Sequence, residues 1–116
     1  MKLLDFSPPV PSAPVVDQIS SDSARVFCAV LPTCTSATIK FRAVDTGIEL
    51  LVDHRSGNKL VRYGGGAVLR AACYAGVVVS GLSPDTEYQV AYSQKSGFGW
   101  SRDSPAGRRQ EWQCWP

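Results

Sequence analysis

Residues 81–92 restrict the possible folds more than any other part of the sequence. Residues 83–85, Ser-Pro-Asp, favour a tight turn, because proline presets φ and the Ser and Asp side chains can bond the local backbone. After this turn, Tyr88, Val90 and Tyr92 alternate with more polar residues, which is the period-2 pattern of a half-buried strand. The stretch therefore predicts the end of one strand, a corner, and a second strand.

Size and charge limit the class of protein. A chain of 116 residues is long enough for one domain with a real core. Its hydrophobic content of 44% and charged content of 19% are ordinary for a globular protein. A net charge of +2 is too small to indicate nucleic-acid binding. No apolar run approaches the roughly 20 residues that a membrane span needs, so we expect no membrane insertion.

The N-terminal residues differ in composition from the rest. Residues 1–12 are rich in Pro and Ser and predict a linker or irregular lead-in, because proline cannot donate a hydrogen bond in a sheet. Residues 13–116 predict a single domain. The short Leu pair near the start is followed by Asp5 and a Pro cluster, which is not the pattern of a secretory signal. The sequence does not indicate the cellular compartment of the protein.

Short alternating runs separated by turn residues recur along the chain and predict an all-β fold of about seven strands. The predicted strands are residues 14–19, 24–31, 38–44, 48–54, 67–80 and 108–115, together with the strand that begins at Tyr88. In the third of them, Ile39 and Phe41 are expected to point inward. Residues 60–63 are too short to assign.

Two stretches allow a second interpretation. The Ala and Leu residues of 67–75 permit a helix, but the β-branched run at 77–79 favours a strand throughout, with a bulge or bend at Gly76. The three glycines at 64–66 lack the Lys-Ser/Thr and the helix of a phosphate-binding loop. They predict a flexible surface turn.

The spacing of Leu82, Pro84, Thr86, Tyr88 and Val90 resembles the tyrosine corner and F strand of fibronectin type III domains. The Pro-rich start, the Ser/Asp turn and the strand closed by Pro32 resemble strands A and B of the same family. The resemblance covers roughly residues 12–112 and is strongest at 81–104.

This resemblance implies a fibronectin type III-like fold, a seven-stranded two-sheet antiparallel β-sandwich. It implies that Tyr88 is buried and that its hydroxyl bonds backbone near residues 82–85. The expected structural residues are Leu82, Pro84, Tyr88, Val90 and Tyr92. Many members carry a Trp near the end of strand B, where this chain has Val30, so another large residue must fill the core.

The residues give no sign of catalysis. The single His54 has no partner motif, no Gly-x-Ser-x-Gly or His-Glu-x-x-His occurs, and the acidic residues are scattered singly. We therefore expect no enzyme, no cofactor and no metal site.

The four cysteines are Cys28, Cys34, Cys73 and Cys114. No Cys-x-x-Cys spacing suggests zinc, and four cysteines allow three pairings that sequence cannot resolve. Cys28 and Cys73 are expected in the core, on neighbouring strands of one sheet, with Cys34 in a loop. Free thiols are expected, and a bridge between Cys28 and Cys73 requires Cα atoms within about 7 Å.

The predicted loop at 95–104 is the best candidate for a binding site, because loops between the last strands of a sandwich often make contacts. Phe98 and Trp100 could be aromatic anchors, with Arg102 beside them and Lys95 at the base. In the alternative interpretation, Trp100 folds back and covers the end of the sandwich. Residues 100–104 also resemble the Trp-Ser-x-Trp-Ser box of cytokine receptors, without its second Trp.

The sequence thus predicts a non-catalytic protein-protein interaction or spacer module of a larger protein or assembly. It would be a monomeric domain that contacts another protein or a neighbouring domain. One alternative is a glycan-binding accessory module that uses Trp100, Trp112 and Trp115 as a stacking platform. The other is a cytokine-receptor-like ligand-binding domain, which would need paired disulfides near the N-terminal strands.

Overall fold

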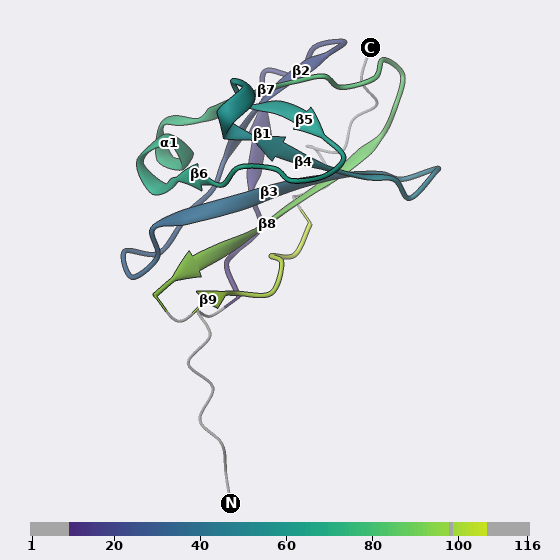
Figure 1. Cartoon of the computed structure of the whole chain (residues 1–116). Helices are drawn as coiled ribbons and strands as arrows, with labels where there is room; N and C mark the ends of the chain where they lie inside the picture. Colours follow the sequence, from purple (N-terminus) through teal and green to yellow (C-terminus); the bar gives the residue numbers. More distant parts are fainter. Residues whose placement is uncertain (1–9, 98, 107–116) are drawn as a thin grey trace, which may run out of the picture.

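The computed structural model describes residues 10–97 and 99–106, and these are mostly β-structure (Figure 1). The strands are β1 (Val15–Asp17), β2 (Ser23–Phe27), β3 (Ser36–Ala43), β4 (Glu49–Asp53), β5 (Lys59–Val61), β6 (Val68–Leu69), β7 (Val77–Ser80), β8 (Tyr88–Ser96) and β9 (Gly99–Trp100). The helices are the 3-10 turn η1 (His54–Ser56) and α1 (Arg70–Ala75). The all-β prediction is confirmed at this level. The predicted strand at 108–115 and most of the predicted N-terminal lead-in lie outside the described residues.

The described strands form one curled sheet in the order β1-β2-β7-β5-β4-β3-β8-β9, with β6 paired to β3 off this path. Neighbours are antiparallel except β5 and β7, which run parallel and are joined by the single residue pair Lys59 and Ser80. The prediction of a wholly antiparallel arrangement is therefore wrong at this pair. Of residues 60–63, left unassigned by the sequence, Leu60 and Val61 belong to β5, which continues the ladder from β4.

The core lies against β3, the long strand that pairs with β8 along its whole length (Figure 1). Ile39 and Phe41 are fully buried, as predicted from their alternation. Phe41 meets the ring of Tyr88 edge-on, with centroids 6.0 Å apart. Val30 is also buried, and the largest fully buried side chains are Tyr92 and Phe41. These two rings supply the bulk expected in place of a Trp at the end of β2.

The corner before β8 has the predicted geometry. Tyr88 is buried, and its hydroxyl oxygen accepts a hydrogen bond of 2.9 Å from the backbone N–H of Ser83. Leu82, Val90 and Tyr92 are buried with it, whereas Pro84 is exposed in the turn. The bond gives a buried phenol a polar partner and fixes the direction in which β8 enters the sheet.

Residues 67–80 do not form one strand, so that prediction is wrong. β6 is followed by α1 and then by β7 (Figure 1). The Ala-rich sequence favours the helix, and it ends at Gly76, whose φ of 98° is open to glycine at little cost. A side chain at Gly76 would also collide with the Phe27 ring, because a Cβ there would lie 2.8 Å from Cε1. The predicted bulge or bend of a strand at Gly76 is instead the end of the helix α1.

The predicted second strand, residues 24–31, ends early at Phe27. Beyond it, the backbone of Cys28 bonds to α1 rather than to a strand, because its N–H donates to the carbonyl of Cys73 at 3.3 Å. Cys28 and Cys73 both lie in the core, as predicted, but not on neighbouring strands. Cys34 is buried as well, and all three thiols are free.

The glycine run is not the flexible surface turn that the sequence predicted. Gly65 and Gly66 run against β4, and Gly66 bonds the end of β4 and the start of η1: its N–H donates to Asp53 Oδ1 at 2.8 Å and its carbonyl accepts from His54 N–H at 3.1 Å. A Cβ on Gly65 would lie 2.8 Å from Leu51 Cβ. A glycine is therefore needed at position 65, where the backbone of β4 passes closely.

We therefore expect Gly65→Ala to lower the free energy of unfolding by about 1–2 kcal/mol, since the added methyl must displace β4 or the loop. Gly97→Ala is the matched control, because a Cβ at Gly97 would meet nothing within 4 Å. Urea unfolding of both variants measures the difference. Equal stabilities would show that the close approach of Gly65 to β4 is wrong.

Asp53 at the end of β4 joins this glycine run to η1. Its carboxylate accepts hydrogen bonds from the hydroxyl of Ser56, from Gly66 N–H and from Arg55 N–H, and it lies 3.5 Å from Arg55 Nε. These bonds, with that from Ser56 the largest contribution, lower the pKa of Asp53 to about 2. The charged form is therefore the one that the fold favours.

This depressed pKa gives a pH dependence with a definite sign. Asp53 stabilises the fold fully above its unfolded pKa of about 3.9, and the contribution is lost as the pH falls through about 2. We expect Asp53→Asn to be less stable than wild type at pH 7, with the difference shrinking between about pH 4 and pH 2. Urea unfolding across this range measures it. A difference that stays constant with pH would contradict the assignment.

Candidate functional site

The predicted loop at 95–104 begins as a hairpin, so its assignment as a loop is wrong at the strand residues 95–96 and 99–100, whereas residues 101–104 lie outside the strands. β8 continues to Ser96, and β9 pairs back onto it through Lys95 with Trp100 and Ser96 with Gly99. Gly99 has a φ of 116°, a conformation that glycine adopts easily where the chain reverses. Lys95 and Trp100 therefore stand on strand backbone, and Arg102 follows β9.

Lys95, Trp100 and Arg102 are here called the hairpin patch. Trp100 is 42% exposed, so part of its ring is covered and part faces solvent. The Nζ atom of Lys95 lies 5.7 Å from the centroid of that ring, a cation–π arrangement. Arg102 is exposed two residues further along. Phe98, the other predicted anchor, lies outside the described residues.

Residues 101–104 are tied to β8 by two buried serines. Ser101 N–H donates to the carbonyl of Gln94 at 2.8 Å, and Gln94 N–H donates to Ser101 Oγ at 2.9 Å. Ser104 repeats the arrangement with Tyr92, at 2.7 and 3.0 Å. Each hydroxyl stands where a neighbouring strand would present a carbonyl. The segment is thereby held along β8, with Arg102 and Asp103 exposed.

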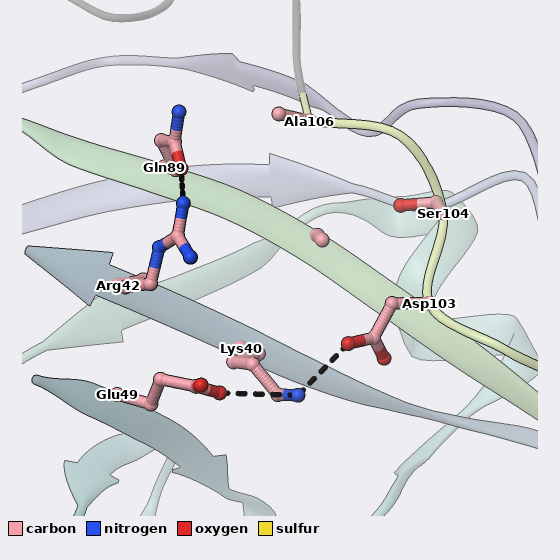
Figure 2. A pocket seen from close by; sticks show the side chains of 8 residues that line it. Lys40, Arg42, Glu49, Gln89, Asp103, Ser104 and Ala106 are labelled. Carbon is pink, nitrogen blue, oxygen red and sulfur yellow. Dashed lines mark hydrogen bonds and ion pairs between the residues drawn. The ribbon is translucent and has the colours of Figure 1, made fainter. Parts of the chain in front are cut away.

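A polar pocket of about 230 Å³ lies on the outward face of β3, β4 and β8, beside this segment (Figure 2). Its lining residues are Lys40, Arg42, Glu49, Gln89, Ala91, Asp103, Ser104 and Ala106. Figure 2 shows Lys40 reaching between two carboxylates, with Nζ 2.8 Å from Asp103 and 3.1 Å from Glu49. Arg42 donates to the amide oxygen of Gln89 across the strands.

The two carboxylates of this polar pocket stabilise the charged form of Lys40. The hydrogen bond to Asp103 is the main cause of the raised pKa of Lys40. Partial burial lowers this pKa, and the hydrogen bond to Glu49 raises it further. Lys40 therefore stays protonated at neutral pH. Ion pairs this exposed contribute about 0.2–1 kcal/mol each, so their main effect here is to hold Asp103 and its segment in place.

The polar pocket was not predicted from the sequence. One signal was available, because the basic residues Lys40 and Arg42 alternate with buried ones and must therefore point away from the core. Their partner Asp103 lies 63 residues from Lys40, and nothing in a single sequence connects the two.

Another exposed aromatic residue lies two residues after the end of β5. Tyr63 is 80% exposed, and the guanidinium carbon of Arg62 lies 5.9 Å from its ring centroid. Tyr63 and Arg62 give a natural comparison for the hairpin patch.

The described residues show no cluster of three or more His, Cys, Asp or Glu side chains that could hold a metal ion. His54 is exposed in η1, and its Nδ1 lies 3.0 Å from Asn58 Oδ1. Within the same residues, no helix has the length and apolar character to cross a membrane. Trp112, Trp115 and Cys114 lie outside this part of the chain.

Comparison with known protein families finds no match, and neither does comparison with curated proteins. Solved structures do match. One, titled "Myokine structure", aligns with a TM-score of 0.61 and 20% sequence identity, over 86% of this chain and 93% of that one. At this identity the likeness concerns the fold alone.

Proposed function

We propose that this chain is a non-catalytic protein-interaction module, in which the hairpin patch contacts the partner. The observation that carries the proposal is the half-exposed ring of Trp100, with Lys95 over it and Arg102 beside it. Trp and Arg are the side chains most often found at the energetic centres of protein interfaces.

The rigidity of the backbone supports this assignment. The two serine ties hold residues 101–104 along β8, and the Lys40–Asp103 ion pair fixes the same segment from the other side. A surface that is already ordered loses little conformational entropy when a partner binds. The polar pocket adjoins it and offers paired charges as a polar rim.

We further propose that the scaffold is a two-sheet sandwich of the fibronectin type III type. Among the described strands, the ladder joins two antiparallel groups, β1-β2-β7 and β4-β3-β8-β9, through β5 and its single parallel residue pair with β7. The hydrogen bond between Tyr88 and Ser83 supports a tyrosine corner between them. Such modules serve as interaction or spacer units of larger proteins.

A second candidate is a cytokine-receptor-like ligand-binding domain. The observation that favours it is the pairing of Ser101 and Ser104 with β8, because these are the two serines of the Trp-Ser-x-x-Ser sequence. The second Trp is replaced by Asp103, which bonds Lys40 instead of stacking on a cation. Receptor binding would use the same surface.

Binding by alanine variants tests the proposal. Wild type, Trp100→Ala and Tyr63→Ala are immobilised, and the proteins that each captures from the source cells are quantified in parallel. We expect Trp100→Ala to weaken capture of the specific partner at least about tenfold, roughly 1.4 kcal/mol, whereas the matched control Tyr63→Ala leaves capture unchanged. Thermal melts first establish that both variants fold. A folded Trp100→Ala that captures the same proteins as wild type would contradict the proposal.

A further inference from the structure

Cys28 and Cys73 are brought together by a backbone hydrogen bond. Cys28 directly follows β2 and Cys73 lies in α1, and the N–H of the first donates to the carbonyl of the second at 3.3 Å. That bond limits the separation of their Cα atoms to about 7 Å, which is the outer limit for a disulfide without backbone movement.

Their side chains also meet. Both residues are buried, at 1% and 0% exposure. Cys73 Sγ donates to the carbonyl of Val68 at 3.8 Å. The neighbouring Cys28 thiol lowers the pKa of Cys73, and the Cys73 thiol raises the pKa of Cys28.

A pocket reaches this buried pair. It has a volume of about 240 Å³ and lies where residues 12–13, the end of β2 and α1 meet. Both Cys28 and Cys73 line it, together with Phe27 and Tyr74. Cys34, the third cysteine of the described residues, is buried but does not line it.

We propose that Cys28 and Cys73 form an oxidisable dithiol site, which a low-molecular-weight disulfide such as glutathione disulfide converts into an intramolecular disulfide. The Cys73 thiolate attacks one sulfur of glutathione disulfide, whose S–S bond breaks and releases one glutathione thiolate. The Cys28 thiol then loses its proton and attacks Cys73 Sγ in the mixed disulfide, which releases the second glutathione. The protein loses two electrons and two protons, and glutathione disulfide is reduced to two glutathione molecules.

The bridge would act on the stability of the module. It would close the chain between residues 28 and 73, which includes β3, β4 and β5, and so restrict the unfolded state. It would also attach α1 covalently to the end of β2. The fold needs little rearrangement, because the two backbones are already hydrogen-bonded.

The test uses the full chain carrying Cys34→Ser and Cys114→Ser, so that only the proposed pair can react. The folded protein is incubated with glutathione disulfide, and the product is digested without reduction and analysed by mass spectrometry. We expect loss of both thiols, a linked peptide containing Cys28 and Cys73, and a melting temperature higher by roughly 5 °C or more. Reduction should reverse all three changes.

Two results would overturn the proposal. One is a stable mixed disulfide with glutathione at either cysteine, because an adjacent partner would displace it. The other is oxidation that occurs only in denaturant, because the pocket would then give no access. If the double serine variant does not fold, disulfide mapping of oxidised wild type decides the matter: a 28–73 linkage supports the proposal, and any other pairing overturns it.

Discussion

Replacement of Phe41 by alanine is expected to lower the free energy of unfolding by about 3–5 kcal/mol, the cost of removing a fully buried ring from a packed core. Phe41 is 0% exposed and lies on β3, between the ladders to β4 and β8. Its ring also supports that of Tyr88. Urea unfolding monitored by circular dichroism measures the loss.

Val78→Ala on β7 is the control for this change, because Val78 is 57% exposed and its truncation should cost little, within about 0.5 kcal/mol. If the two variants lost similar stability, Phe41 would not be the centre of the core.

The second large effect is expected at Tyr88, where removal of the hydroxyl alone should cost about 1–3 kcal/mol. Tyr88→Phe leaves the backbone N–H of Ser83 without the acceptor that holds the corner. Denaturant melts of this variant measure the loss.

Tyr92 provides the comparison on the same strand and face. Its hydroxyl is buried near Ser12 and the backbone of Ala29, without a hydrogen bond of good geometry, and burial raises the pKa of Tyr92 to about 12. Tyr92→Phe should therefore be neutral or stabilising, by up to about 1 kcal/mol, because the phenol gains little from its hydroxyl. A larger loss at Tyr92 than at Tyr88 would contradict the account of the corner.

Local patterns in the sequence predicted β3, β4 and the Tyr88 corner, because alternation and turn chemistry act over a few residues. They failed at α1, where Ala-rich sequence and a β-branched run compete within one stretch and Gly76 separates them. The prediction of a flexible turn at the glycine run was wrong for a different reason. Its close approach to β4 depends on a chain segment that lies 13 residues away.

The same distinction applies to the candidate site. Trp100, Arg102 and Lys95 were found because aromatic and basic residues stand out locally. The residues that hold the segment 101–104 in place, such as Gln94 and Lys40, lie on β8 and β3. Only the folded chain brings these residues to that segment. The contact between Cys28 and Cys73 likewise follows from the packing of α1 against the end of β2.

Site-specific photocrosslinking tests most directly whether a partner binds the hairpin patch. A benzoylphenylalanine side chain is placed at position 97, in the turn beside the hairpin patch where a Cβ would meet nothing within 4 Å, in one protein and at position 63 in another, and both are irradiated with the source-cell proteins. Binding at the hairpin patch predicts a discrete crosslinked partner from position 97 that position 63 does not yield. The same partner from position 63 with none from position 97 would contradict it, as would no discrete product from position 97.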